Sequence, residues 1–138
     1  MKLHEDEARR RAAGADHAVL GTLRPDGRID LVPACFGIDG DVVAVPVDRV
    51  KPKRGSTLQR ERNLAAEPRA TLLCEAWDAT DWTRLWWVRL RLERSEEPRA
   101  TIERLEAGLR ERYPQYRDEP FATVLTFRIR AVDGWSAS

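Results

Sequence analysis

The segment HAVLGTLRPDGRIDLVPACFGIDGDVVAVPV, residues 17–47, constrains the fold most, because apolar and polar residues alternate along it between two turn signals. Pro25-Asp26-Gly27 and Asp39-Gly40 each supply a glycine where a tight turn needs positive φ. The pattern predicts three antiparallel strands near 17–24, 28–36 and 42–47. Because Pro33 and Pro46 cannot donate ladder hydrogen bonds, we expect them at an edge, at a bulge or where a strand leaves its sheet.

Beyond this meander, the chain alternates between helical and strand patterns. Helical patterns predict three helices, at 2–13, from the Ser56/Gln59 capping-box spacing to 66, and at 95–112 behind an acidic first turn. Alternation predicts further strands at 69–76, 85–93 and 121–131. The order of helix, three strands, helix, two strands, helix and strand predicts a mainly β fold. We expect an antiparallel barrel of about six strands, closed, with helices filling the gaps.

Size and composition favour one globular domain covering residues 1–138. Of the 138 residues, 42% are hydrophobic and 34% charged, which is typical of a folded domain rather than a disordered chain. No apolar run approaches the roughly 20 residues that span a bilayer, and the charged N-terminal segment lacks the apolar core of a signal peptide, so a cytoplasmic location without membrane association is expected. A net charge of +1 argues against a general nucleic-acid binder.

Several kinds of chemistry lack the residues they would need. Cys35 and Cys74 lie in predicted strands without CxxC spacing, so buried free thiols are a better interpretation than a disulfide or redox role. His4 and His17 are the only histidines, too few for a histidine-rich metal site. No dinucleotide-binding fingerprint, P-loop or hydrolase nucleophile motif is present. Any chemistry is therefore expected to come from a bound organic cofactor.

A basic cluster stands out between Val47 and Asn63. It precedes and enters a predicted helix, whose N-terminus offers free N–H groups that suit a phosphate or carboxylate, and Ser56 and Thr57 add hydroxyls. A solvated surface loop is the alternative, and the sequence does not decide between the two. The six basic residues are Arg49, Lys51, Lys53, Arg54, Arg60 and Arg62.

The second unusual feature is a group of tryptophans, Trp77, Trp82, Trp86 and Trp87. In a strand, Trp86 and Trp87 point to opposite faces, so one ring can pack in the core while the other faces a groove or a second subunit. Purely structural packing is the simpler interpretation. A ring facing a groove would also form a flat wall for a planar cofactor.

Together, the order of elements and the segments VPACFGIDGD, KPKR, RNLAAEPRATLL, DWTRLWWVR, RYPQYR and GWSAS resemble the pyridoxamine 5′-phosphate oxidase-like split barrels. They are most similar to flavin/deazaflavin oxidoreductase family B, and to a subfamily thought to depend on F-420. The resemblance implies an FMN-binding type of split barrel and a homodimer that shares two cofactor sites across its interface. It implies coenzyme F-420 as the cofactor, with FMN as the alternative.

The resemblance also implies a set of site residues. The loop after the third strand and the following helix would grip the cofactor phosphate, the second strand would lie along the ring system, and two strand tryptophans would stand beside the ring. After Arg89 the relatives have a glycine turn and a further short strand, whereas LRLERSEEPRA runs on here, so the resemblance does not define the shape of the substrate side of the pocket. The implied cofactor-binding residues are Pro33, Ala34, Cys35, Lys51, Lys53, Arg54, Thr57, Arg60, Trp86 and Trp87.

The expected activity is hydride transfer between reduced F-420 and a small organic acceptor. The alternatives are an FMN-dependent oxidoreductase of the same fold and a non-catalytic carrier of F-420 or flavin. Neither the substrate nor the proton donor follows from the sequence, and a backbone N–H, a water molecule and Tyr116 all remain open as the donor.

Overall fold

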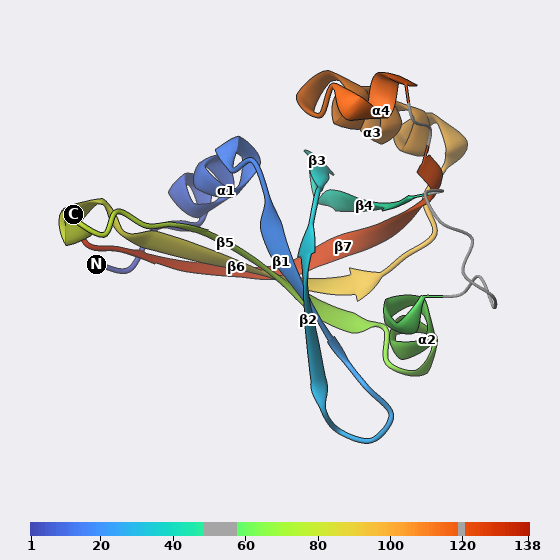
Figure 1. Ribbon diagram of the computed structural model, residues 1–138, viewed down its shortest axis with the longest axis horizontal. Coiled ribbons are helices and arrows are strands. Elements are labelled where there is room, and N and C mark those ends of the chain that lie inside the picture. The colour runs from blue at the N-terminus through green and yellow to red at the C-terminus, as the bar shows by residue number, and fades with distance from the viewer. Residues whose placement is uncertain (49–57, 119–120) are drawn as a thin grey trace.

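The computed structural model describes residues 1–48, 58–118 and 121–138, which form one curled sheet with helices around it (Figure 1). In chain order the elements are α1 (Glu5–Gly14), β1 (Ala18–Leu23), β2 (Ile29–Ala34), β3 (Gly37–Asp39), β4 (Val42–Asp48), α2 (Gln59–Ala66), β5 (Arg69–Ala76), a 3-10 turn η1 (Trp82–Arg84), β6 (Trp86–Arg94), α3 (Arg99–Arg112), α4 (Gln115–Asp118) and β7 (Phe121–Ser136).

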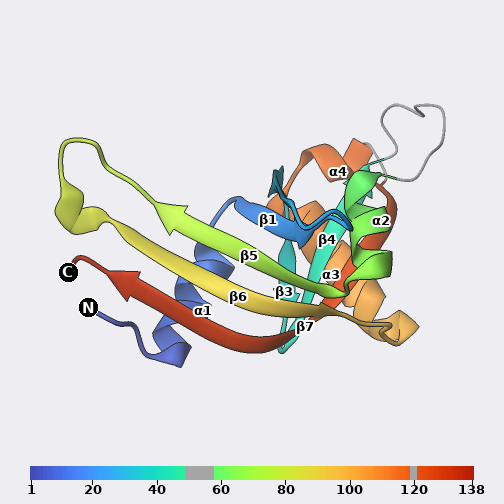
Figure 2. The ribbon, with the colours of Figure 1, turned by 90° about the horizontal axis from the view of Figure 1, so that it is seen from below.

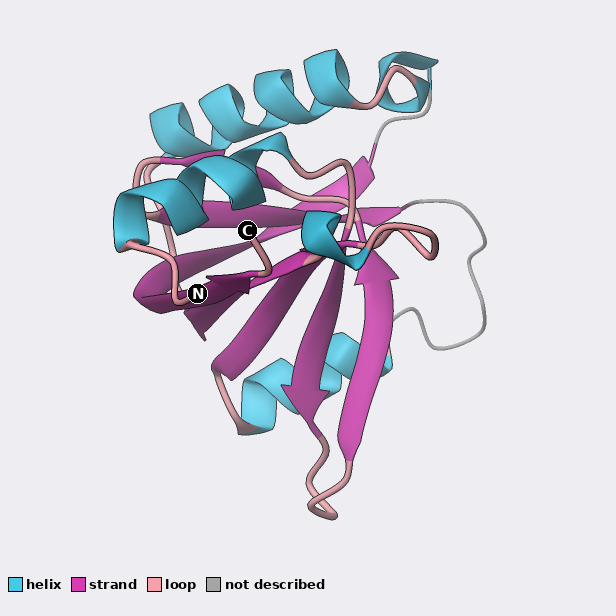
Figure 3. Cartoon of the chain, turned by 90° about the vertical axis from the view of Figure 1, so that its left-hand side faces the viewer, coloured by secondary structure: helices cyan, strands magenta, loops and turns pink. Residues whose placement is uncertain are grey.

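The sheet has seven antiparallel strands in the order β2-β1-β5-β6-β7-β4-β3. Strands β2 and β3 are separated in the chain only by Cys35 and Phe36, yet they lie at opposite edges of the sheet. The prediction of a mainly β split barrel is confirmed, but the prediction of a closed barrel is wrong, because no ladder within the described residues joins β2 to β3. Figure 3 shows the sheet curling between its two edges.

The barrel is open because the predicted strand at 28–36 is interrupted. It ends at Ala34, and a separate strand β3 then pairs with β4 across the Asp39-Gly40 turn, where Gly40 has φ of 60°. Pro33 lies in edge strand β2, and Pro46 lies in β4 beyond the end of its ladder with β3, as expected for residues that lack an N–H donor.

Strand β7 joins the two parts of the sheet. Its first half pairs with β4 and its second half with β6, and it is 16 residues long. The sequence predicted only residues 121–131 of it. The extension to Ser136 brings the C-terminal end beside the N-terminus, where Leu3 N–H donates to the Gly134 carbonyl at 2.9 Å.

Two apolar clusters hold the elements together. The larger one fills the inside of the curled sheet with inward side chains such as Leu20, Leu72 and Phe127, and α1 adds two fully buried alanines. The smaller one lies between α3 and the other side of β4 and contains Val42, Ala44, Leu105 and Leu109. Strand β4 is therefore buried on both faces, which explains its unbroken apolar run.

Helix α2 begins later than its capping-box signal predicts. Ser56 lies outside the described residues, and the N-cap is Leu58, so Gln59 is the first helical residue rather than the third. The Gln59 amide instead donates to the Asn63 side chain at 2.8 Å. The spacing of Ser56 and Gln59 predicted a capping box, but the Gln59 side chain hydrogen-bonds to Asn63 of the same helix instead.

Helix α3 also begins later than predicted, at Arg99 with Pro98 as its N-cap. The expected acidic first turn is wrong, because Glu96 and Glu97 precede the helix. Glu97 instead accepts a hydrogen bond at 2.8 Å from Arg128 of β7. Among the described residues, no helix is both long enough and apolar enough to cross a membrane.

Candidate functional site

The outward side chains of β2, β1, β5 and β6 form one face of the sheet, which we call the outer face. The ladders place Pro33, Val19, Leu73 and Arg89 side by side across four strands, and Asp133 of β7 continues the row. These positions alternate with the buried ones, so they point away from the core. No described helix covers the outward side chains of β1 and β2, which are exposed or half-buried.

A groove of about 620 Å³ runs along this outer face. We call it the apolar groove, because β1, β2 and β5 line most of it with aliphatic side chains. Ile29 and Leu31 are 69% and 68% exposed, an unusual state for large aliphatic residues on neighbouring positions of one strand. The aliphatic lining consists of Val19, Leu23, Ile29, Leu31, Ala70, Leu73 and Leu92.

Gly21 contributes to the floor of the apolar groove. A Cβ atom at this position would lie 3.2 Å from Leu31 Cδ2 and 3.7 Å from the Thr71 carbonyl oxygen. The absence of a side chain at Gly21 therefore leaves a shallow depression between β2 and β5, against which a flat group can lie.

Charged residues on and near the rim of the groove neutralise one another. Hydrogen bonds from Arg69 lower the pKa of Glu67 to about 2, so this carboxylate stays ionised at any ordinary pH. Arg91 donates to Thr71 Oγ1 at 3.1 Å. A rim whose arginines already have partners suits the uncharged face of a ring better than it suits a phosphate. The ion pairs are Arg69 with Glu67 at 2.6 Å, Arg89 with Asp133 at 2.5 Å and Arg130 with Glu93 at 2.9 Å.

The two strand tryptophans point to opposite faces of β6, as predicted. Trp86 packs against the core, with the Arg11 guanidinium 5.7 Å from its ring centre. Trp87 lies on the outer face opposite Trp135, and the Arg89 guanidinium stands 4.4 Å over its ring. Of these two tryptophans, Trp87 is therefore the one that shares a face with the apolar groove.

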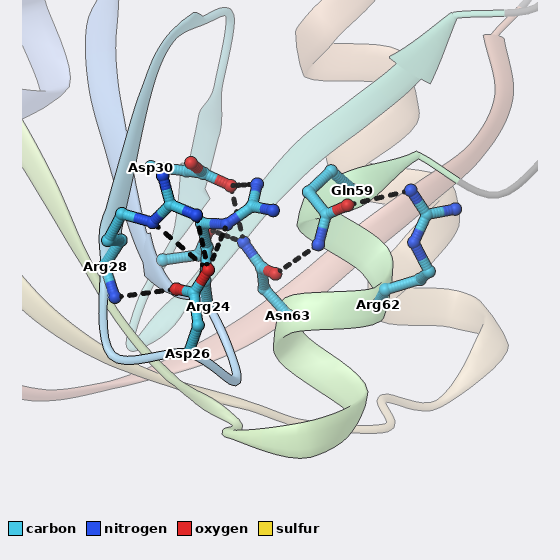
Figure 4. A network of polar contacts seen from close by, with 8 residues as sticks. Arg24, Asp26, Arg28, Asp30, Gln59, Arg62 and Asn63 are labelled. Carbon is cyan, nitrogen blue, oxygen red and sulfur yellow. Dashed lines mark hydrogen bonds and ion pairs between the residues drawn. The ribbon is translucent and has the colours of Figure 1, made fainter.

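A buried polar network fastens α2 to the hairpin of β1 and β2 (Figure 4). The Asn63 amide, fully buried, donates to Thr22 Oγ1 at 3.0 Å and to Asp30 Oδ2 at 2.9 Å. Its carbonyl accepts from Gln59, and Arg24 lies 3.3 Å from the same Asp30 oxygen. The strands that carry the groove and the helix that follows the basic cluster are therefore held in one arrangement.

Sequence reasoning did not identify this network. Its one signal was an asparagine next to Leu64 on the buried side of a short amphipathic helix. A polar residue in such a place needs hydrogen-bond partners, but the sequence does not indicate which strands supply them.

The predicted cofactor residues do not all lie on one face of the sheet, and some lie outside the described residues. Pro33 is exposed on the outer face, the Ala34 side chain is buried in the core, and Cys35 is half-buried just after β2. Arg60 lies in the first turn of α2, and its Nε is buried without a hydrogen-bond partner among the described residues. Arg60 belongs to the basic cluster, so this donor is available to an anion, although Arg24 Nε is in the same unpartnered state. Lys51, Lys53, Arg54 and Thr57 lie outside the described residues.

Both cysteines are free, and Cys74 is buried as predicted. Burial raises the pKa of the Cys74 thiol to about 12, so it stays neutral and unreactive in the folded chain. Cys35 is only half-buried. Within the described ranges, no group of three or more His, Cys, Asp or Glu side chains is placed to hold a metal ion.

Comparisons with known proteins show the fold. No protein-family profile matches the chain, and no curated protein matches it by sequence. A conserved hypothetical protein from Mycobacterium tuberculosis matches with a TM-score of 0.73 and 20% identity over 98% of this chain and 86% of that chain. A FAD-binding protein from Mesorhizobium loti matches with a TM-score of 0.72 and 14% identity over 97% and 93% of the two chains.

A protein named F420 reductase matches with a TM-score of 0.54 and 21% identity, over 88% of this chain and 90% of that chain. Proteins described as heme-binding, from Mycobacterium smegmatis, and as heme storage, from Vibrio cholerae, match as well. At these identities the likeness concerns the fold alone. The chain is a split β-barrel of the type found in flavin-binding proteins.

Proposed function

We propose that this chain is an oxidoreductase that uses coenzyme F-420 to move a hydride to or from a small organic acceptor, and that it works as a homodimer in the cytoplasm. The observation that carries the proposal is the apolar groove on the outer face of a split barrel. It is open, lined by aliphatic side chains, and edged by ion pairs that leave it without strong net charge. Two structural neighbours, by their names, bind FAD or act as an F420 reductase, which supports a flavin-like cofactor.

The residues present fit such a cofactor. When bound, reduced F-420 supplies the hydride, and the chain supplies orientation and the exclusion of water. Val19, Leu31 and Leu73 offer apolar contacts to one face of a planar ring, and Gly21 leaves room for it to lie close to the backbone. Pro33, next to Val19 in the sheet, extends this contact along β2. Trp87 continues the outer face beyond Arg89.

The anionic part of the cofactor is proposed to bind the basic cluster. Lys53, Arg54 and Thr57 hold the phosphate in this proposal, while Arg49, Lys51 and one of Arg60 and Arg62 receive the glutamates of the F-420 tail. The support among the described residues is the buried, unpartnered Nε of Arg60. Six basic residues exceed what a single FMN phosphate requires, which favours F-420 over FMN.

Fluorescence titration of the apoprotein tests this proposal. We expect F-420 with a long glutamate tail to bind more tightly than a short-tailed form, and the advantage to shrink at high salt, because exposed charges are screened over roughly 8–10 Å at physiological ionic strength. FMN should bind more weakly and with less dependence on salt. Tighter binding of FMN would contradict the choice of cofactor and favour an FMN-dependent oxidoreductase.

A carrier of the cofactor is separated from an enzyme by turnover. If the protein is an enzyme, it should catalyse the oxidation of reduced F-420 by a suitable acceptor, at a rate that scales with protein concentration. Binding without turnover across nitro, quinone and enone acceptors would identify a non-catalytic carrier instead.

A further inference from the structure

A second pocket lies between α2 and the end of β6, and it shares no lining residue with the apolar groove. Its volume is about 320 Å³, at the lower end of the range for small-molecule sites. Leu64 and Ala65 of α2 and Leu125 of β7 line its apolar side, and Arg94, the last residue of β6, lines its polar side. Figure 2 shows α2 beside the end of β6, where the chain turns toward α3. We call this place the α2 pocket.

Arg94 is an unusual residue for its position at the end of the core. It follows the buried Leu90 and Leu92 at alternate positions of β6, so its side chain points to the core side of the sheet. Its guanidinium carbon stands 5.8 Å from the ring centre of the buried Phe127. Burial lowers the pKa of this guanidinium, yet an arginine stays charged at any ordinary pH. A charge taken out of water in this way is unfavourable unless partners compensate for it.

The hydrogen bonds of Arg94 use only part of its guanidinium. Nη1 donates to the backbone carbonyl of Thr126 at 2.8 Å and to that of Ser95 at 3.2 Å. Among the described residues, Nε and Nη2 have no hydrogen-bond partner, and neither atom is fully buried. Two neighbouring N–H groups of a guanidinium can bind one carboxylate through two parallel hydrogen bonds. The Nε and Nη2 edge of Arg94 is therefore available to a carboxylate that enters the pocket.

Two carboxylates flank this guanidinium from different elements. Glu61 of α2 and Glu96, two residues after β6, also line the pocket, and both raise the Arg94 pKa against the larger effect of burial. In the described part of the chain, neither of them forms an ion pair with Arg94. With one positive and two negative side chains, the pocket would repel a phosphate or the glutamates of F-420. It suits a ligand that carries a carboxylate and a positive group close together.

We propose that the α2 pocket binds a free α-amino acid with an aliphatic side chain. The carboxylate of the ligand binds the Nε and Nη2 edge of Arg94, and its ammonium group lies between Glu61 and Glu96. Its aliphatic side chain packs against Ala65 and Leu125. The pocket is separate from the apolar groove, so this site does not depend on the proposed function.

Isothermal titration calorimetry with matched probes tests the class of ligand. L-Leucine carries all the required groups, isocaproate lacks the amine, and isopentylamine lacks the carboxylate. We expect leucine to bind with a dissociation constant of about 0.1–1 mM, and each truncated probe to bind at least about tenfold more weakly. No binding of leucine at roughly 10 mM would overturn the proposal. Equal affinity for isocaproate would overturn the choice of an amino acid.

Filling the pocket shows where leucine binds. Ala65→Phe places a ring in the pocket without removing any hydrogen bond of Arg94, and it should weaken leucine binding at least about tenfold. Ala66→Phe is the matched control, because this alanine is also exposed on α2 but does not line the pocket. The control should bind leucine as the wild type does, and both variants should keep the wild-type melting temperature. Unchanged leucine affinity in Ala65→Phe would overturn the proposal.

Charge variants separate binding from a purely structural role of Arg94. Arg94→Lys keeps the positive charge but loses the paired donors, so leucine should bind about ten- to a hundredfold more weakly. Glu61→Gln with Glu96→Gln should weaken leucine binding at least about tenfold while isocaproate binds as well as before or better. Unchanged leucine affinity in both variants would overturn the proposal, and the two alanine variants decide it if Arg94→Lys folds poorly.

Discussion

Replacing Asn63 by alanine should destabilise the fold more than its position in a short helix suggests. The change removes the donors to Thr22 Oγ1 and to the Asp30 carboxylate, and the acceptor for Gln59. A buried group left unsatisfied costs about 1–3 kcal/mol, and a hydrogen bond to a charged group contributes about 1.5–3 kcal/mol. Asp30 keeps Arg24 as a partner and Gln59 is only half-buried, so we expect a loss of about 2–4 kcal/mol in the free energy of unfolding.

Thermal and urea unfolding followed by circular dichroism measure this loss. For a chain of this size, each kcal/mol corresponds to roughly 3–5 °C, so the melting temperature should fall by about 6–20 °C. Thr22→Val is the matched control, because it removes one hydroxyl and leaves the Asn63 amide its bond to Asp30. It should cost about 1–2 kcal/mol, less than Asn63→Ala, because a single buried Asn63 N–H loses its partner. An Asn63→Ala protein that melts within a few degrees of wild type would show that water replaces the network and that the reasoning is wrong.

Three further predictions concern the groove, the thiols and the basic cluster. Gly21→Val should weaken F-420 binding by at least about tenfold without lowering the melting temperature, because valine suits a strand and only the exposed Leu31 side chain must shift; unchanged affinity in the titration would remove the ring from this groove. A thiol-specific disulfide reagent at pH 8 should modify Cys35 well before Cys74; because the folded pKa of Cys74 lies above its unfolded value of 9.0, its contribution to stability is present below pH 9.0 and is lost as pH rises towards about 12 in unfolding titrations. Lys53→Ala should weaken F-420 binding about ten- to a hundredfold at unchanged melting temperature, whereas Lys2→Ala should do neither, and an early-melting Lys53 variant that binds normally would make the loop structural.

The sequence predicted individual strands well, because alternation and turn residues are local. Strand β5 was predicted with its observed bounds, and β1 within one residue at each end. The break after Ala34 was missed, since Cys35 and the buried Phe36 continue the apolar run without a turn residue. An apolar side chain that enters the core looks the same in a sequence whether its strand goes on or changes partner.

The candidate site was harder to predict, because it arises from strands that are distant in the chain. Alternation within each strand indicates that Val19, Leu31 and Leu73 point away from the core. Only the order of the strands in the sheet shows that they lie close together. The opposite orientation of Trp86 and Trp87 followed from strand geometry alone and is confirmed. The phosphate-binding role of Lys53 remains a prediction, because that residue lies outside the described part of the chain.

The position of β7 between β6 and β4 sets the order in which this molecule can fold. Strands β2, β1, β5 and β6 can assemble as one ladder and β3 with β4 as another, but among the strands that the structure describes only β7 hydrogen-bonds to both. During synthesis, the edges of β6 and β4 that pair with β7 therefore stay unpaired until β7 has emerged from the ribosome. Non-local pairing of this kind slows folding and leaves edges open to aggregation. Truncations within β7 should accordingly yield insoluble protein rather than a smaller folded barrel.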